Sequence, residues 1–362
     1  MTSLHDSQRM PGLDGVRGIA CLTVVISHSA NVGFLPSILG KGAGQFGVML
    51  FFALSGFLMA ALYAKRELSQ TEAVKYVIAR LARIYPLYFT AILISYLIYS
   101  FVDSGFIFQM SFDQLLKHAG LFGYIDIFWT IPTEMQFYVY FLVIWFVLSR
   151  FRYGLHVFIL LTLAQLSVLV LPTPNYPGPF YSVISKIHFF LAGAGAAIIF
   201  QNYATRLRAR VTGYELPVLF IIYVLVWPGI SRKLFGVSGD IWREEAFAIL
   251  MALIVLFAAM EKGKLSAVLR SGVFRWLGEV SFAMYLVHRP ILDYAMRLHV
   301  HGKVPLYVAY GCFWVVLFIL VHVSLNYLEK PTRRWINNWG EMTAIPYFKR
   351  FKSLVKIQKG CD

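Results

Sequence analysis

The stretch LDGVRGIACLTVVISHSAN, residues 13–31, is apolar and long enough to span a bilayer, yet it carries an acid, a base and an imidazole. On an α-helix, His28 follows Arg17 by eleven residues, about three turns, so both side chains point to one side, and Asp14 lies one turn before Arg17. Ionisable groups inside a membrane are costly unless they are paired or hydrated. We therefore expect other helices to enclose the polar face of this one.

The whole chain has the composition of an integral membrane protein. Of its 362 residues, 59% are hydrophobic and only 14% are charged, and the mean hydropathy of +0.65 exceeds that of soluble domains. The net charge of +15 could indicate nucleic-acid binding, but the cytoplasmic loops of membrane proteins are also rich in Lys and Arg. Three widely separated cysteines indicate neither a disulfide framework nor a metal cluster, so we expect no metal.

Ten apolar stretches predict an all-α polytopic bundle of about ten transmembrane helices with both termini in the cytoplasm. They lie near residues 13–31, 46–63, 85–102, 130–148, 155–171, 184–200, 215–229, 244–260, 279–297 and 304–327. This topology puts 23 of the 33 Lys and Arg residues on the cytoplasmic side, which explains the charge without nucleic acid. Residues 1–335 would form one membrane-embedded domain, and residues 336–362 a basic cytoplasmic tail on anionic membrane lipids.

Two ionisable side chains are expected at similar heights in the outer half of the membrane. His28 lies near the outer end of the first predicted span, and Glu134 lies about one turn into the fourth. In a low-dielectric cavity, such a pair could remove a proton from a hydroxyl, with the carboxylate orienting the imidazole. The alternative is a hydrogen bond between them that only stabilises helix packing.

Basic residues with helical spacing precede the third predicted span. Arg80 and Arg83 fall on one helical face and could clamp phosphates, and Arg17 could add a third cation. The alternative is that they are ordinary cytoplasmic flanking residues. In the second span, Gly47, Ser55 and Gly56 would allow close helix packing.

The ninth predicted span contains SFAMYLVHRP, residues 281–290, in which Pro290 should kink the helix. His288 and Arg289 there need polar surroundings. Glu329, after the tenth span, is expected at the inner interface, where pairing with an Arg would satisfy it. The sequence has no Gly-rich phosphate loop, Gly-x-Ser-x-Gly elbow or Cys/His metal spacing, which argues against a serine hydrolase or a zinc enzyme.

Six motifs occur in a fixed order along nearly the whole chain. They are LDGVRGIA at residues 13–20 with His28, SGF at 55–57, RLARIYP at 80–86, WTIPTEMQFY at 129–138, SFAMYLVH at 281–288 and LEKP at 328–331. Together they resemble the acyltransferase-3 family of integral membrane acyltransferases. The resemblance implies transfer of an acyl group, usually acetyl, from cytoplasmic acyl-CoA (acetyl-CoA) to a hydroxyl of an extracytoplasmic glycan such as exopolysaccharide or O-antigen. It also implies a bacterial cytoplasmic (inner) membrane location.

The resemblance further implies roles for particular residues. The catalytic group would be His28, Glu134 and Arg17. The acyl-CoA site would comprise Arg80, Arg83, Tyr85 and Arg17, and the acceptor would contact Trp129 and Asp14. Many members carry an aromatic residue where this chain has Arg289, so the resemblance assigns no catalytic role to His288.

Two questions stay open at the level of sequence. Embedded charges also mark transport pathways, so a transporter or flippase of a glycan intermediate is the alternative from another class. Within the enzyme class, the acceptor could instead be a lipid, a lipid-linked glycan, peptidoglycan or a small metabolite. His28 could deprotonate the acceptor directly or first accept the acyl group itself.

Overall fold

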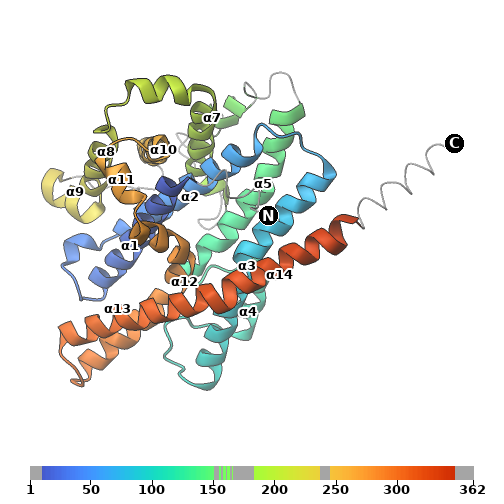
Figure 1. Ribbon diagram of the computed structural model, residues 1–362. Helices are drawn as coiled ribbons and strands as arrows, with labels where there is room; N and C mark the ends of the chain where they lie inside the picture. The colour runs from blue at the N-terminus through green and yellow to red at the C-terminus, as the bar shows by residue number, and fades with distance from the viewer. Residues whose placement is uncertain are drawn as a thin grey trace.

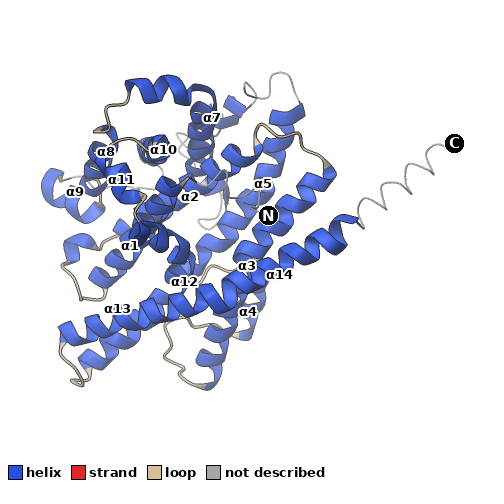
Figure 2. Cartoon of the chain, viewed as in Figure 1, coloured by secondary structure: helices blue, strands red, loops and turns tan. Residues whose placement is uncertain are grey.

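The computed structural model describes residues 10–150, 183–236 and 245–346, with a few residues between 155 and 165. Helices joined by loops make up this part of the chain, and it contains no strand (Figure 2), which confirms the all-α class. The longer helices are α1 (Pro11–Asn31), α2 (Ala43–Tyr63), α3 (Gln70–Phe101), α5 (Thr130–Arg150), α7 (Ile187–Arg210), α8 (Glu215–Leu225), α10 (Glu245–Met260), α12 (Gly272–Val300) and α13 (Leu306–Val323). The shorter ones are η2 (Ser37–Leu39), α4 (Phe112–Ala119), η3 (Asp126–Trp129), η4 (Val183–Ser185), α9 (Pro228–Phe235), α11 (Lys264–Leu269), η5 (Ser324–Glu329), α14 (Lys330–Trp339) and η6 (Gly340–Ala344).

Five helical segments of the described residues are long and apolar enough to cross a membrane. They are Ser37–Tyr63, Gln70–Phe101, Asp126–Arg150, Ile187–Arg210 and Leu306–Thr343, and a sixth is formed if the bent pair α8 and α9 is one span. The helices with the embedded charges, α1 and α12, are not among them. The protein therefore has the helices of an integral membrane protein, while the count of ten spans and the cytoplasmic position of both termini stay predictions. The fifth expected span, residues 155–171, lies mostly outside the described residues, as do residues 347–362 of the expected tail.

Two predicted spans differ from the helices that form. The third was expected at residues 85–102, but α3 begins at Gln70, where the Ser69 hydroxyl accepts a hydrogen bond from the Glu72 amide and caps the helix. Arg80 and Arg83 therefore lie inside this helix, because its first turns are polar and extend beyond the apolar stretch. The seventh, expected at residues 215–229, breaks before Pro228 and turns by 80°.

Glycines bring the central helices into backbone contact. A Cβ atom at Gly56 of α2 would collide with the Phe190 carbonyl of α7, and one at Gly193 of α7 would collide with Ala53 of α2. Similarly, Gly278 of α12 lies against the backbone of α1. The glycines of α2 thus have the packing role expected from the sequence, whereas the Ser55 hydroxyl bonds to Glu134. The contact at Gly278 thus holds α1 tightly against α12.

The C-terminal helices form a long arm. In Figure 1, α13 and α14 follow one another across the molecule, and α14 lies beside α3. Gly340, just after α14, packs on Ile78 of α3. This arrangement brings Arg333 close enough to Arg80 and Arg83 for their charges to interact.

Candidate active site

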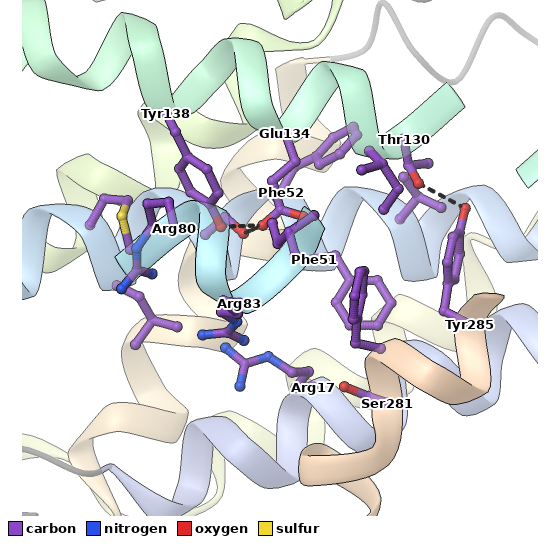
Figure 3. Close-up of a pocket in the computed structure, with 17 residues that line it drawn as sticks. Arg17, Phe51, Phe52, Arg80, Arg83, Thr130, Glu134, Tyr138, Ser281 and Tyr285 are labelled. Atoms are coloured by element: carbon purple, nitrogen blue, oxygen red, sulfur yellow. Dashed lines mark hydrogen bonds between the residues drawn. The ribbon is translucent and has the colours of Figure 1, made fainter. Parts of the chain in front are cut away.

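A cavity lined by three arginines lies between α1, α2, α3, α5 and α12, and we call it the arginine cavity (Figure 3). It contains about 690 Å³ of space not occupied by atoms, open solvent included. Its charged and polar lining residues are Arg17, Ser55, Arg80, Arg83, Thr130, Glu134, Tyr138, Ser281 and Tyr285. Figure 3 shows the guanidinium groups toward one end and the Thr130–Tyr285 hydrogen bond toward the other. The i, i+3 spacing of Arg80 and Arg83 thus puts both at one cavity, as expected.

The arginines of this cavity are only partly neutralised. Arg17 lies 3.5 Å from the Asp14 carboxylate, measured from Nη1 to Oδ1. Arg80 is 6% exposed, and its guanidinium carbon lies 5.8 Å from the centre of the Tyr138 ring. The Nε atom of Arg80 is buried and has no hydrogen-bond partner in the described part of the chain. A buried guanidinium with an open N–H favours an anionic ligand such as a phosphate.

Glu134 is fixed inside the arginine cavity by two hydroxyl groups. Ser55 of α2 and Tyr138 of α5 each donate a hydrogen bond to its Oε1 atom at 2.6 Å. The expected pairing of Glu134 with His28 is therefore wrong. The turn of α5 that carries Glu134 faces α2 and the arginines, whereas His28 lines a different cavity.

The second cavity contains His28, and we call it the histidine cavity. It also holds about 690 Å³ and is lined by Val24, His28, Gly44, Gln45, Val48, Asp126, Ile127, Trp129 and Tyr285. Asp126 has a positive φ of 41°, and its Oδ2 atom lies 3.4 Å from the Arg289 guanidinium of α12. Trp129 packs edge-on against Phe52, with 6.1 Å between the ring centres. An imidazole, an amide, a carboxylate and an indole thus surround this space.

The two cavities share two lining residues, Val48 and Tyr285. The Tyr285 hydroxyl donates to the Ile127 carbonyl at 3.0 Å and accepts from the Thr130 hydroxyl at 3.1 Å. These bonds tie α12 to the junction of η3 and α5. Tyr285 is therefore a fixed part of the wall between the cavities.

The hydrogen-bond partner of His28 is a second histidine. His28 Nδ1 lies 2.7 Å from His288 Nε2, and the two rings lie edge to edge in nearly the same plane, with 5.0 Å between their centres and 10° between their planes. His288 is completely buried on α12. The polar face of α1 is thus completed by α12, which satisfies the expectation that other helices enclose it.

Comparison with known proteins identifies the family. A family model described as an acyltransferase domain, Acyl_transf_3, matches residues 10–324. The chain belongs to the acyltransferase-3 family. The matched range includes both cavities, the three arginines and the histidine pair.

Relatives of this acyltransferase include the O-acetyltransferase OatA of Staphylococcus aureus. The proteins of strains COL and MW2 are each 24% identical to this chain over 368 residues, which cover 92% of it and 59% of the relative. The chain thus spans about three fifths of the length of these relatives. No solved structure matches the chain.

Not every residue expected in the site of this acyltransferase lies in a cavity. Tyr85 donates a hydrogen bond to the Ala119 carbonyl at 3.0 Å, so it faces the end of α4 and does not line the arginine cavity. Asp14 lines neither cavity and instead contacts Arg17. Trp129 does line the histidine cavity, and its role in acceptor binding stays a prediction. The described residues contain no group of three or more His, Cys, Asp or Glu side chains that could hold a metal ion.

The contacts and roles of several polar residues at the site were not predicted from the sequence. Tyr138 and Ser55 hold Glu134, Gln45 and Asp126 line the histidine cavity, and His288 pairs with His28. The contact of Tyr138 with Glu134 could have been predicted, since Tyr138 follows Glu134 by one helical turn. The contact of His288 with His28 could not, because His288 lies 260 residues from His28 and no local spacing connects them.

Proposed function

We propose that this acyltransferase is a membrane O-acetyltransferase that moves an acetyl group from acetyl-CoA, bound in the arginine cavity, to a glycan hydroxyl in the histidine cavity. The observation that carries the proposal is that two cavities of different chemistry share one wall, made by Val48 and Tyr285. The OatA relatives are O-acetyltransferases by name, which supports the reaction type.

The arginine cavity suits the donor because coenzyme A carries several phosphate groups on one end and the thioester on the other. Arg17, Arg80 and Arg83 supply three guanidinium groups, and the open Nε of Arg80 supplies a buried N–H. Guanidinium groups bind phosphates in bidentate fashion. With the phosphates at this end, the slender pantetheine arm would run past Tyr285 toward His28.

The histidine cavity suits a sugar acceptor. Trp129 offers an aromatic face, while Gln45 and Asp126 offer an amide and a carboxylate for hydroxyl groups. Sites for small polar molecules combine aromatic walls with a few placed polar groups in this way. His28 is then the base beside the acceptor.

The transfer needs one proton acceptor and one electrophile. The acceptor hydroxyl gives its proton to His28, its oxygen attacks the thioester carbonyl carbon, and the carbon–sulfur bond breaks. His28 then returns the proton to the leaving thiolate, so the products are the O-acetyl glycan and free coenzyme A. General base catalysis of this kind contributes about 10²- to 10⁴-fold to a rate. Glu134, held by Ser55 and Tyr138, lies on the donor side and would balance the arginine charges there.

The proposal also covers the membrane in which the protein lies and the side from which each substrate binds. The excess of Lys and Arg in one set of predicted loops supports donor binding from the cytoplasm and acceptor binding outside, in a bacterial cytoplasmic membrane. Exopolysaccharide and O-antigen are the proposed acceptors.

The test is acetyl transfer by the purified protein in liposomes, measured with labelled acetyl-CoA and an exopolysaccharide acceptor. We expect His28→Ala to reduce transfer at least about 100-fold and to leave acetyl-CoA binding unchanged. His301→Ala is the matched control, since His301 lies exposed after α12 and lines neither cavity. A wild-type rate in His28→Ala would contradict the proposal, and glycan movement without acetyl-CoA would favour a transporter.

A further inference from the structure

The starting observation is that both ring nitrogens of His288 have partners. Its Nδ1 atom lies 2.8 Å from the Tyr285 carbonyl oxygen and 3.1 Å from the Met284 carbonyl oxygen, one turn back on α12. Its Nε2 atom lies 2.7 Å from His28 Nδ1. Turning the ring by 180° would place a carbon atom at this 2.7 Å separation, which is too short for a carbon–nitrogen contact. The orientation of the ring is therefore determined by its neighbours.

These contacts determine which atoms carry protons. A carbonyl oxygen can only accept a hydrogen bond, so Nδ1 of His288 must be the protonated nitrogen. A neutral imidazole has one N–H, so Nε2 of His288 is an acceptor. A second proton would put a charge on a side chain that is completely buried. Nδ1 of His28 must then donate the hydrogen bond between the rings, which leaves the lone pair on Nε2 of His28.

We propose that His288 is a positioning residue that holds His28 in the Nδ1–H tautomer, so that Nε2 of His28 is the atom that reacts. The reactive role rests on the proposed function, but the tautomer does not. His28 lines the histidine cavity, and its Nε2 atom has no hydrogen-bond partner in the described residues. A lone pair on this atom is what an incoming hydroxyl group requires.

The packing of α1 on α12 keeps this pair in place. The rings are nearly parallel, and the glycine contact between Gly278 and the α1 backbone sets the distance between the helices. The carbonyls that orient His288 belong to the α12 backbone itself, so they move with the ring. The base is therefore oriented before substrate arrives, which lowers the cost of reaching the reactive geometry.

The first test reads the tautomer directly and needs no substrate. Nitrogen-15 NMR of the histidine-labelled protein in lipid distinguishes Nδ1–H from Nε2–H imidazoles, and the His28 signal is identified by its loss in His28→Gln. We expect His28 as the Nδ1–H tautomer in the unmodified protein. An Nε2–H tautomer of His28 would overturn the inference, even if acetyl transfer were confirmed. Conversely, the Nδ1–H tautomer would support it even if the acceptor proved not to be a glycan.

The second test separates positioning from a structural role. His288→Gln keeps a carbonyl oxygen that can accept from His28 Nδ1–H, whereas His288→Met has similar bulk and no strong acceptor. We expect kcat to fall about 10- to 100-fold in His288→Met, with both KM values changed less than about twofold and His28 losing its single tautomer. His288→Gln should recover most of kcat. Equal losses in both variants, or wild-type kcat in His288→Met, would overturn the inference.

Discussion

The arginine cavity and the histidine cavity share a wall, but each leaves a different kind of group open. In the arginine cavity, one oxygen of the Glu134 carboxylate accepts hydrogen bonds from two hydroxyls, while Nε of Arg80 remains an unused donor. In the histidine cavity, the carboxylate of Asp126 is paired with Arg289, while Nε2 of His28 remains an unused acceptor. An open donor binds an anion, and an open lone pair takes a proton.

This contrast suggests a division of labour between the two cavities. Leaving a buried polar group without a partner costs about 1–3 kcal/mol, so such a group is retained where a ligand can satisfy it. The arginine cavity should therefore set affinity for the donor. The histidine cavity should set affinity for the acceptor and the rate of transfer.

Of the two effects on affinity, the larger is expected for the donor. Each charged hydrogen bond to a phosphate contributes about 1.5–3 kcal/mol, so Arg80→Gln should raise the KM for acetyl-CoA about 10- to 100-fold. Steady-state kinetics at saturating acceptor would measure it, with kcat changed little. Arg275→Gln is the control, since it removes the same charge from an exposed position that lines neither cavity. An equal increase in that control would show a general charge effect instead of a donor site.

A smaller effect is expected on acceptor affinity. Trp129→Ala removes the aromatic wall of the histidine cavity and should raise the KM for the glycan about 2- to 10-fold, while the KM for acetyl-CoA stays the same. Trp129→Phe should retain most of the affinity. Trp335→Ala, at a side chain that is 69% exposed on α14, controls for loss of a tryptophan. A change in the KM for acetyl-CoA with Trp129→Ala would contradict the assignment of donor and acceptor to separate cavities.

The smallest effect concerns a charge cluster that lines neither cavity. Asp103 accepts hydrogen bonds from the Gly105 amide, Tyr294 and Arg297, and these bonds, the Gly105 amide first, hold the pKa of its carboxyl below the usual 3.8. Because the folded pKa is lowered, the stabilising contribution is present above pH 4 or so and is lost as the pH falls through the folded value.

We therefore expect Asp103→Asn to lower the melting temperature slightly at pH 7, with a difference from the unmodified protein that shrinks below about pH 4. Thermal unfolding followed by tryptophan fluorescence would measure both values. Neither KM should change. A shift in either KM would mean that this cluster, which joins the loop after α3 to α12, also shapes a cavity.

Much of the fold was predictable because helix formation by long apolar segments is a local property. The second and fourth expected spans match α2 and α5 closely, since each contains enough apolar residues to mark its own limits, and the first matches the bounds of α1. The length of α3 was underestimated, because its first turns are polar and lie outside the apolar stretch that predicted the span. The bend between α8 and α9 was missed, because the apolar stretch continues up to the proline that breaks it.

The sequence by itself determined the helices, the shared face of Arg80 and Arg83, and the presence of an imidazole within an apolar segment, since all of these depend on residues a few turns apart. Only the tertiary structure decided that His28 pairs with His288 and that Glu134 belongs with the arginines. The physical reason is that these partnerships depend on how helices distant in the sequence cross. The crossing of α1 and α12, for example, is set by the backbone contact at Gly278, which helical periodicity does not encode.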